Sequence, residues 1–215
     1  MYDRDYFERN GYGRDAKRET AYRQESGRIF ARVSGGSVID YGCGTGEFLD
    51  YFDGWKRYGV EISDYAAMVA RGKGIKIIKA EYYSPVYFNL VVFRGTLQHL
   101  DDPFNALRWA HYQLRPGGTL AILAQPNAES VVYRLFGDLP ALDWTRNYWI
   151  PGKRELCNVL EHIGFTVQDV IYPYRGGPYA SPAKDTWRFV QRLFGRRVKF
   201  AWPGNMMEVY AVKHD

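Results

Sequence analysis

Short apolar runs alternate with segments of helical spacing along most of the chain. The runs have the length and residue types of strands and cover residues 38–39, 58–63, 75–80, 88–93 and 119–126. Residues 63–74 and 102–114 instead place apolar side chains every three or four positions. Ser63 or Asp64 marks the start of the first helix, and Pro103 marks the start of the second. Alternating strands and helices predict an α/β fold in which helices cover both faces of a parallel sheet.

The remaining segments are less regular. A helix over 153–165 and strands over 165–173 and 206–213 complete the pattern, and a turn is expected at 115–118. Residues 48–52 have helical spacing, and residues 1–36 are polar, aromatic and helix-leaning. The stretches 127–152 and 173–205 show no period, and stretches of this length in a compact domain are usually lids or other functional segments.

Residues 38–52, "VIDYGCGTGEFLDYF", raise the first functional question. Gly42, Gly44 and Gly46 follow an apolar run directly, at alternate positions. Glycines at the end of a strand let the backbone turn tightly and come close to a ligand. Glu61 stands 21 positions after Asp40 and closes the next strand, where an acid suits the hydroxyls of a ribose. The pattern predicts a nucleoside site, and the alternative is a turn that only packs a helix on a strand.

The residues around the glycines narrow the choice of nucleoside. A dinucleotide-binding pattern would need a third glycine at position 47, but that residue is Glu47, whose carboxylate repels a pyrophosphate. Asp40 likewise suits a ligand with a positive end. S-adenosylmethionine has an ammonium, a sulfonium and a ribose diol, and it has no phosphate.

Several segments resemble the motifs of the class I S-adenosylmethionine-dependent methyltransferases. "VIDYGCGTG" resembles the family's first motif, "GVEIS" the second and "FNLVVFRGTLQHLDDPFNAL" the fourth, and "LRPGGTLAI" and "ELCNVLEHIGF" resemble the segments that follow. The resemblance covers residues 37–172 and the last strand. It implies a Rossmann-like, seven-stranded, mostly parallel sheet with an antiparallel last strand and helices on both faces.

The first two motifs imply cofactor contacts. By resemblance, Gly42, Cys43 and Gly44 bring backbone toward the methionine part of S-adenosylmethionine. Asp40 orders that loop and lies near the ammonium, and Glu61 receives the ribose hydroxyls. The reaction product would be S-adenosylhomocysteine.

The later motifs extend the implied site. Ile62 would pack on the adenine, and Ala80 and Glu81 stand where the adenine amino group is often received. Arg94 and Gly95 would close the fourth strand beneath the cofactor. Two alternatives stay open: Glu81 as a solvated loop acid, and Arg94 as the partner of a nearby carboxylate.

His99 is the candidate catalytic residue. It follows the fourth strand, on the side where the methyl group should point, and could act as a general base or orient the acceptor. The alternative is a histidine that caps the loop before Asp101. Ubiquinone-pathway O-methyltransferases resemble this segment but carry carboxylates where this chain has Gly95 and Gln98. We therefore expect a metal-independent enzyme with no metal ligands.

The acceptor should contact the variable segments. Residues 142–153 are rich in Trp, Tyr and Arg, which suit sugars and planar rings, and residues 126–137 are similar to methyltransferases of surface-glycan and lipid-linked sugar pathways. The expected function is methyl transfer to a small-molecule acceptor, a hydroxyl of a sugar or glycolipid intermediate. Alternatives are a quinone- or polyketide-type acceptor and a non-catalytic cofactor-binding domain.

These assignments suggest a division of the chain. Residues 1–36 would form a helical, aromatic cover over the cofactor, with Tyr6 or Phe7 shielding the methyl donor. Residues 37–215 would form the methyltransferase domain, and the stretches 127–152 and 173–205 would be lid-like insertions.

Composition and charge limit the possible partners. The chain has 215 residues, a net charge of +5 and two cysteines, which suit one domain in a reducing cytoplasm. It lacks the Asn/Asp-Pro-Pro-Tyr motif of nucleic-acid methyltransferases, so no nucleic-acid partner is expected. The basic, apolar segment 185–200 could hold a phosphate-bearing acceptor or lie on an anionic membrane. Alternatively, this segment is an amphipathic cover for the sheet edge with a solvated basic side. The sequence predicts no oligomeric state.

Overall fold

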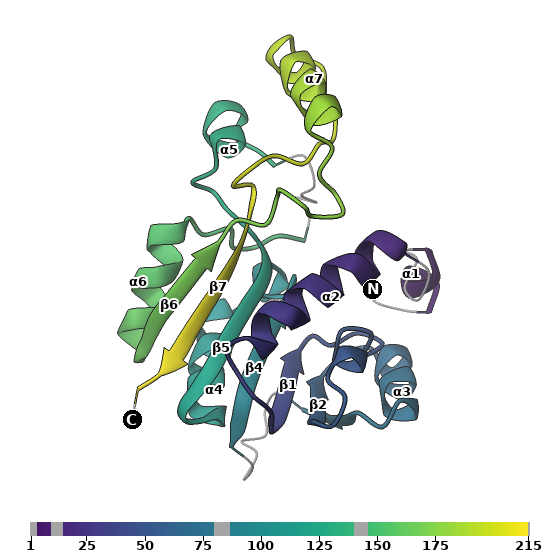
Figure 1. Ribbon diagram of the computed structural model, residues 1–215, viewed down its shortest axis with the longest axis vertical. Helices are drawn as coiled ribbons and strands as arrows, with labels where there is room; N and C mark the ends of the chain where they lie inside the picture. The colour runs from purple at the N-terminus through teal and green to yellow at the C-terminus, as the bar shows by residue number, and fades with distance from the viewer. Residues whose placement is uncertain (1–3, 10–14, 80–86, 140–145, 215) are drawn as a thin grey trace.

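One mixed sheet organises the molecule (Figure 1). The computed structural model describes residues 4–9, 15–79, 87–139 and 146–214. The sheet has seven strands in the order β3-β2-β1-β4-β5-β7-β6. Their bounds are Ser37–Tyr41 (β1), Lys56–Val60 (β2), Lys76–Ile78 (β3), Phe88–Arg94 (β4), Leu114–Pro126 (β5), Phe165–Ile171 (β6) and Met206–Lys213 (β7). Strand β7 is antiparallel to both β5 and β6, whereas the pairs among β1 to β5 are parallel, so the predicted fold is confirmed.

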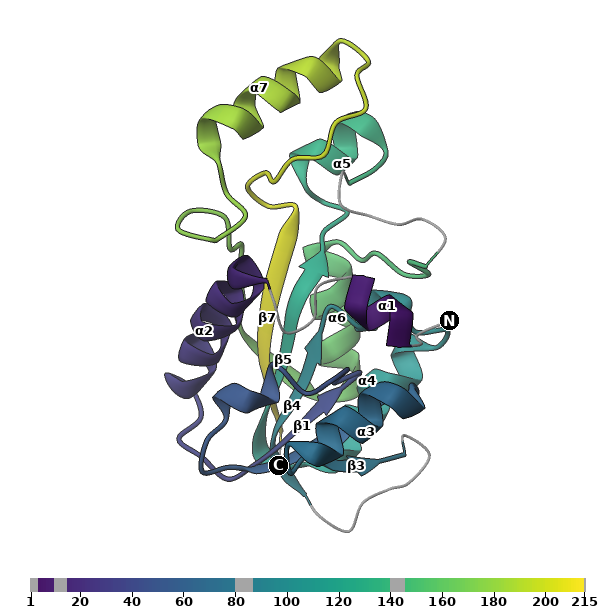
Figure 2. The same ribbon diagram turned by 90° about the vertical axis from the view of Figure 1, so that its right-hand side faces the viewer.

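Helices cover both faces of the sheet (Figures 1 and 2). One face carries α2 (Ala16–Phe30) and α3 (Asp64–Gly72), and the other carries α4 (Pro103–Gln113) and α6 (Lys153–Ile163). The predicted helix starts are confirmed, because Ser63 caps α3 and Pro103 stands in the first turn of α4. Helix α1 (Arg4–Arg9) lies beside α3, and α5 (Val131–Phe136) and α7 (Pro182–Leu193) stand beyond the sheet. In the described ranges, no helix combines the length and apolar character needed to span a bilayer.

The central strands are buried on both faces, as parallel strands between two helical layers must be. Ile39 in β1 belongs to the apolar cluster under α4 and α6, whereas its neighbour Val38 belongs to the cluster under α2. Val91 and Leu90 in β4 divide in the same way. This double burial fixes β1 and β4 side by side and places their carboxyl ends at one edge of the sheet.

Two local expectations differ from the structure. Residues 48–52 form only a short 3₁₀ turn, Leu49–Tyr51, because Gly54 at a φ of +73° already turns the chain toward β2. Their apolar side chains are buried nevertheless, and Tyr22 of α2 packs edge-on against Phe48 with ring centroids 5.5 Å apart. The expected turn at 115–118 lies inside β5, where the pairing with β4 changes register.

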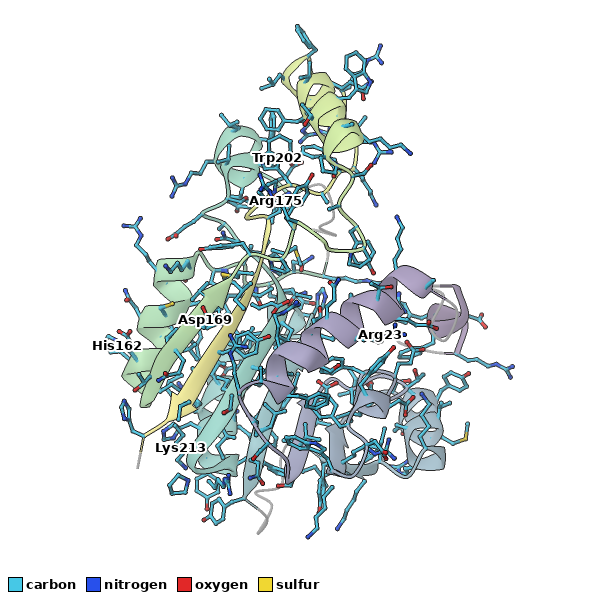
Figure 3. The ribbon with its side chains drawn as sticks, in the orientation of Figure 1. Arg23, His162, Asp169, Arg175, Trp202 and Lys213 are labelled. Atoms are coloured by element: carbon cyan, nitrogen blue, oxygen red, sulfur yellow. The ribbon has the colours of Figure 1, made fainter. Side chains whose placement is uncertain are left out.

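Charged side chains attach α2 to the sheet. Arg28 donates to both oxygens of Glu208 in β7, at 2.8 and 2.5 Å, and the Tyr210 hydroxyl donates to the same carboxylate at 2.8 Å. Farther along, Arg32 donates to Asp169 in β6 at 2.6 Å; Figure 3 labels Asp169 near the outer edge of the sheet. Because Glu208 is fully buried, its negative charge depends on Arg28 for compensation.

Replacement of Arg28 by Ala should therefore destabilise the protein strongly. Removal of one partner from a buried pair costs about 3 kcal/mol, toward the low end of the usual range here because the Tyr210 hydroxyl still donates. Arg154→Ala is the matched control, since Arg154 pairs with Glu129 at an exposed site and should change stability by less than about 1 kcal/mol. Urea denaturation of both variants measures the difference, and equal effects would contradict the assigned role of Arg28.

Candidate functional site

The carboxyl ends of β1, β2 and β4 bring the predicted site residues to one edge of the sheet. Strand β1 lies between the other two, with Asp40 opposite Gly59 on one side and Val92 on the other. Glu61 follows β2 directly, and Gly95 follows β4 directly. The sheet therefore gathers residues that are far apart in the sequence, at the edge where α/β proteins bind ligands.

The glycine loop is held against its neighbours by backbone contacts. The N–H groups of Gly42 and Cys43 donate to the Val60 carbonyl at 2.8 and 3.1 Å. Gly42 has a φ of +83°, and a Cβ atom there would lie 2.5 Å from the Thr96 side chain. A larger residue would thus be strained and would collide with the segment after β4. The loop therefore packs closely against the end of β2 and against the segment that follows β4.

Glu61 joins this loop to the end of β2. One carboxylate oxygen accepts from the Gly44 N–H at 2.8 Å, and the other accepts from the Ser63 N–H at 2.7 Å. Each oxygen keeps a further lone pair, so the carboxylate can still accept from hydroxyl groups. The adjacent Ile62 side chain is 81% exposed, an apolar surface directly beside the acid.

Asp40 is a strongly perturbed carboxyl of the site. Its side chain is buried, and no group in the described part of the chain donates to its Oδ1. Burial raises the pKa of Asp40 to about 7, against the lowering effect of Arg94, and the nearby charges of Glu61 and Glu25 raise it further. A buried carboxyl oxygen without a donor is suited to a cationic or hydrogen-donating ligand.

Arg94 is already engaged by a carboxylate, the alternative left open by the sequence. Its guanidinium donates to both oxygens of Glu25 in α2, at 2.6 and 3.2 Å, and lies over the Tyr22 ring at 4.2 Å. Burial raises the pKa of Glu25, and Arg94 opposes that rise. Sequence reasoning missed Glu25, because nothing in its polar helix distinguishes it from the surrounding charged residues.

His99 ends the short 3₁₀ helix Leu97–His99 that follows β4. Its Nδ1 lies 2.5 Å from the Arg146 carbonyl, which can only accept, so Nδ1 carries the proton. The lone pair is then on Nε2, 3.4 Å from the Gln98 amide nitrogen. Helix α4, which follows, is capped by Asp102, whose carboxylate accepts from the Asn105 N–H at 2.8 Å. His162 points away from this edge, on the outer side of α6 (Figure 3).

Some of the predicted site residues lie outside the described part of the chain. Ala80 and Glu81 lie outside the described residues, as do residues 142–145 of the predicted acceptor segment. Phe7 is buried and packs against Tyr65 of α3, with ring centroids 6.1 Å apart. Where side chains are described, no group of three or more His, Cys, Asp or Glu residues is arranged to hold a metal ion.

Comparison with known proteins places this geometry in a family. Residues 14–170 match the family model described as a methyltransferase domain. No curated protein matches the chain. A methyltransferase from Archaeoglobus fulgidus has a similar structure, with 19% identity over 98% of this chain and 100% of that one and a TM-score of 0.70.

Two further solved structures are similar. A Thermotoga maritima protein described as a possible histamine N-methyltransferase is 22% identical over 93% of this chain and 91% of its own, with a TM-score of 0.61. A Burkholderia thailandensis 1,6-didemethyltoxoflavin-N1-methyltransferase, solved with that compound and S-adenosylhomocysteine, is 22% identical over 98% and 86%, with a TM-score of 0.64.

The fold and the family match together identify the class of enzyme. The chain belongs to the class I S-adenosylmethionine-dependent methyltransferases, and its cofactor is S-adenosylmethionine.

Replacement of Asp40 by Asn should change how stability depends on pH. The unfolded carboxyl has a pKa of about 4, whereas the folded one has a pKa of about 7. Between these values the folded state holds the extra proton, so wild-type stability falls as pH rises through this window. Asp40→Asn removes that loss, so the stability difference between variant and wild type should grow by about 2–4 kcal/mol from pH about 4 to 7.

Urea denaturation at a series of pH values measures this difference. Asp53→Asn is the control, because Asp53 is an exposed residue of the loop before β2. Parallel pH profiles for wild type and Asp40→Asn would contradict the raised pKa.

Proposed function

We propose that the enzyme transfers a methyl group from S-adenosylmethionine to a small-molecule acceptor, a hydroxyl of a sugar or glycolipid intermediate. The observation that carries the choice of a hydroxyl is the His99 imidazole, whose Nδ1 is held by the Arg146 carbonyl and whose Nε2 bears the lone pair. A hydroxyl is a weak nucleophile until it loses its proton, and a positioned histidine is the usual base near neutral pH.

The charges around Asp40 support a cationic cofactor. Within the described residues, the carboxyls of Glu25 and Glu61 and the guanidinium of Arg94 act on Asp40. Asp40 therefore lies near two other acidic groups and one cation, and Arg94 is engaged by Glu25, so no described group donates to Asp40 Oδ1. A ligand ammonium or sulfonium would relieve this excess of negative charge, whereas a phosphate would increase it.

The glycine loop and β2 would hold the rest of the cofactor. Glu61 would receive the ribose hydroxyls on its remaining lone pairs, and its two backbone donors already fix its orientation. The backbone of Gly42, Cys43 and Gly44 would follow the methionine part, and exposed Ile62 would pack on the adenine.

The remaining cofactor contacts also stay proposals. Ala80 and Glu81 would receive the adenine amino group, and Gly95 would lie beneath the cofactor with Arg94. Because Arg94 is bound to Glu25, we assign its guanidinium an electrostatic influence on Asp40. Residues 1–36 and the insertions 127–152 and 173–205 would cover the cofactor and the acceptor.

The reaction demands positioning more than acid–base power. S-adenosylmethionine supplies an electrophilic methyl group on its sulfonium. His99 would orient the acceptor hydroxyl and take its proton on Nε2 while the new bond forms. No carboxylate is present at residues 95 and 98 to join a metal site, so we expect transfer without a metal ion. A quinone- or polyketide-type acceptor is the alternative that the acceptor assays must distinguish.

Replacement of Glu61 by Ala should lower affinity for S-adenosylhomocysteine at least tenfold, because hydrogen bonds to a charged group contribute about 1.5–3 kcal/mol each. Calorimetric titration measures the change. The 2′-deoxy analogue separates ribose recognition from loop support: wild type should bind it more weakly than the parent compound, and Glu61→Ala should bind both alike. Unchanged affinity for S-adenosylhomocysteine in Glu61→Ala would rule out the ribose role.

Replacement of His99 by Asn should lower kcat by about 10²–10⁴, the usual contribution of a general base. The Asn amide can still donate to the Arg146 carbonyl, so the variant removes the base and keeps the contact. Formation of S-adenosylhomocysteine with sugar, glycolipid and quinol acceptors, in excess chelator, measures the rate. We expect turnover with a sugar or glycolipid; turnover only with quinols, or full activity of His99→Asn, would contradict the proposal.

A further inference from the structure

Helices α5 and α7 form an arm that stands beyond the carboxyl edge of the sheet, and both views show it clear of the other helices (Figures 1 and 2). We define the arm as residues 131–139 and 182–200. Its first segment follows β5, which ends at Pro126, and its second segment lies between β6, which ends at Ile171, and β7, which begins at Met206. The arm therefore lies on the same edge of the sheet as the glycine loop and His99.

The inward face of α7 is fixed by specific contacts. The Phe189 ring is stacked on Trp202 at 4.5 Å between centroids, and Figure 3 shows Trp202 between α7 and the sheet. Asp185 accepts from the Ser181 N–H at 2.7 Å and from the Tyr174 hydroxyl at 3.0 Å. Arg192 donates to both oxygens of Asp138, at 2.7 and 2.6 Å. These contacts, spaced along one side of the helix, determine which side faces outward.

The outward side of α7 carries large apolar side chains. Trp187, Val190 and Phe194 stand at i, i+3 and i+7 on one face; Trp187 and Phe194 are 63% and 83% exposed, and Val190 is half-buried. The arm exposes three more apolar side chains, Leu193, Val131 and Leu135. An apolar surface of this kind marks an interaction site rather than an ordinary solvated face.

The arm also carries exposed cations. Six exposed basic residues lie in the arm and form no ion pair with the described part of the chain: Arg134, Lys184, Arg188, Arg196, Arg197 and Lys199. The arm has two acids, and both are engaged internally, Asp138 by Arg192 and Asp185 by Ser181 and Tyr174. Its outer surface therefore combines large apolar side chains with an excess of positive charge.

We propose that the arm is a docking surface for an anionic lipid bilayer. Aromatic and aliphatic side chains on one helical face insert at the lipid interface, and surrounding Lys and Arg side chains are attracted to anionic headgroups. A second copy of the chain fits this surface poorly, because symmetric contact would bring two sets of six cations together. Docking would turn the carboxyl edge of the sheet toward the bilayer. The proposal concerns this surface alone and holds whatever the acceptor is.

Vesicle flotation tests the proposal with the full chain. We expect binding to vesicles of equal parts phosphatidylcholine and phosphatidylglycerol, weaker binding at high salt, and little binding to phosphatidylcholine alone. The variant Arg188→Gln/Arg196→Gln/Arg197→Gln should lose affinity at least tenfold, since each cation near an anionic surface contributes severalfold. Its control, Arg71→Gln/Arg108→Gln/Arg115→Gln, removes the same charge from exposed positions elsewhere and should bind like wild type.

The apolar contribution needs a separate variant. Trp187→Ser/Phe194→Ser should lose vesicle binding while keeping its circular dichroism spectrum and its affinity for S-adenosylhomocysteine. Three results would overturn the proposal: no binding of wild type to the mixed vesicles, an equal loss in the control triple variant, or a wild-type oligomer that Trp187→Ser/Phe194→Ser dissociates in sedimentation equilibrium. The last would identify the arm as a contact between copies of the chain.

Discussion

At the carboxyl edge of the sheet, the buried carboxyl of Asp40 is influenced by one cation, Arg94, and by two further carboxyls, Glu25 and Glu61. Glu25 engages Arg94 directly, Glu61 is stabilised by backbone donors, and Asp40 remains buried with an oxygen that accepts no hydrogen bond from a described group. This imbalance of charge cannot be satisfied by the fold alone. We propose that it favours a ligand with positive groups, and S-adenosylmethionine carries two, an ammonium and a sulfonium.

The rest of the architecture maintains that imbalance. Helix α2 supplies Glu25, and the ion pair between Arg28 and Glu208 attaches this helix to strand β7. Both α2 and the last strand therefore support the site. The glycine loop can pack on Val60 and Thr96 only because Gly42 has no side chain. Stability and binding are thus linked: the buried acid that lowers stability near neutral pH is the one proposed to meet the ligand.

Local patterns predicted most of the fold, and long-range contacts explain what they could not. Periodicity located the strands and the helices that begin at Ser63 and Pro103, and the spacing of Asp40 and Glu61 located the glycine loop. No periodic signal identified Glu25, because its meaning depends on Arg94, 69 positions away. Likewise, α7 has an amphipathic pattern, but only the contacts of Asp185, Phe189 and Arg192 reveal that its apolar side faces outward.

The central claim is that Asp40, whose pKa is about 7 in the folded protein, gives up its proton when it becomes the counter-ion of the bound cofactor. Calorimetry of S-adenosylhomocysteine binding, in buffers of different ionisation enthalpy at pH about 6.5, counts the protons exchanged on binding. We expect wild type to release a fraction of a proton per ligand bound at this pH. The release should be absent in Asp40→Asn, and in wild type it should fall toward zero well above pH 7. Binding without proton release in wild type, or an equal release in Asp40→Asn, would contradict it.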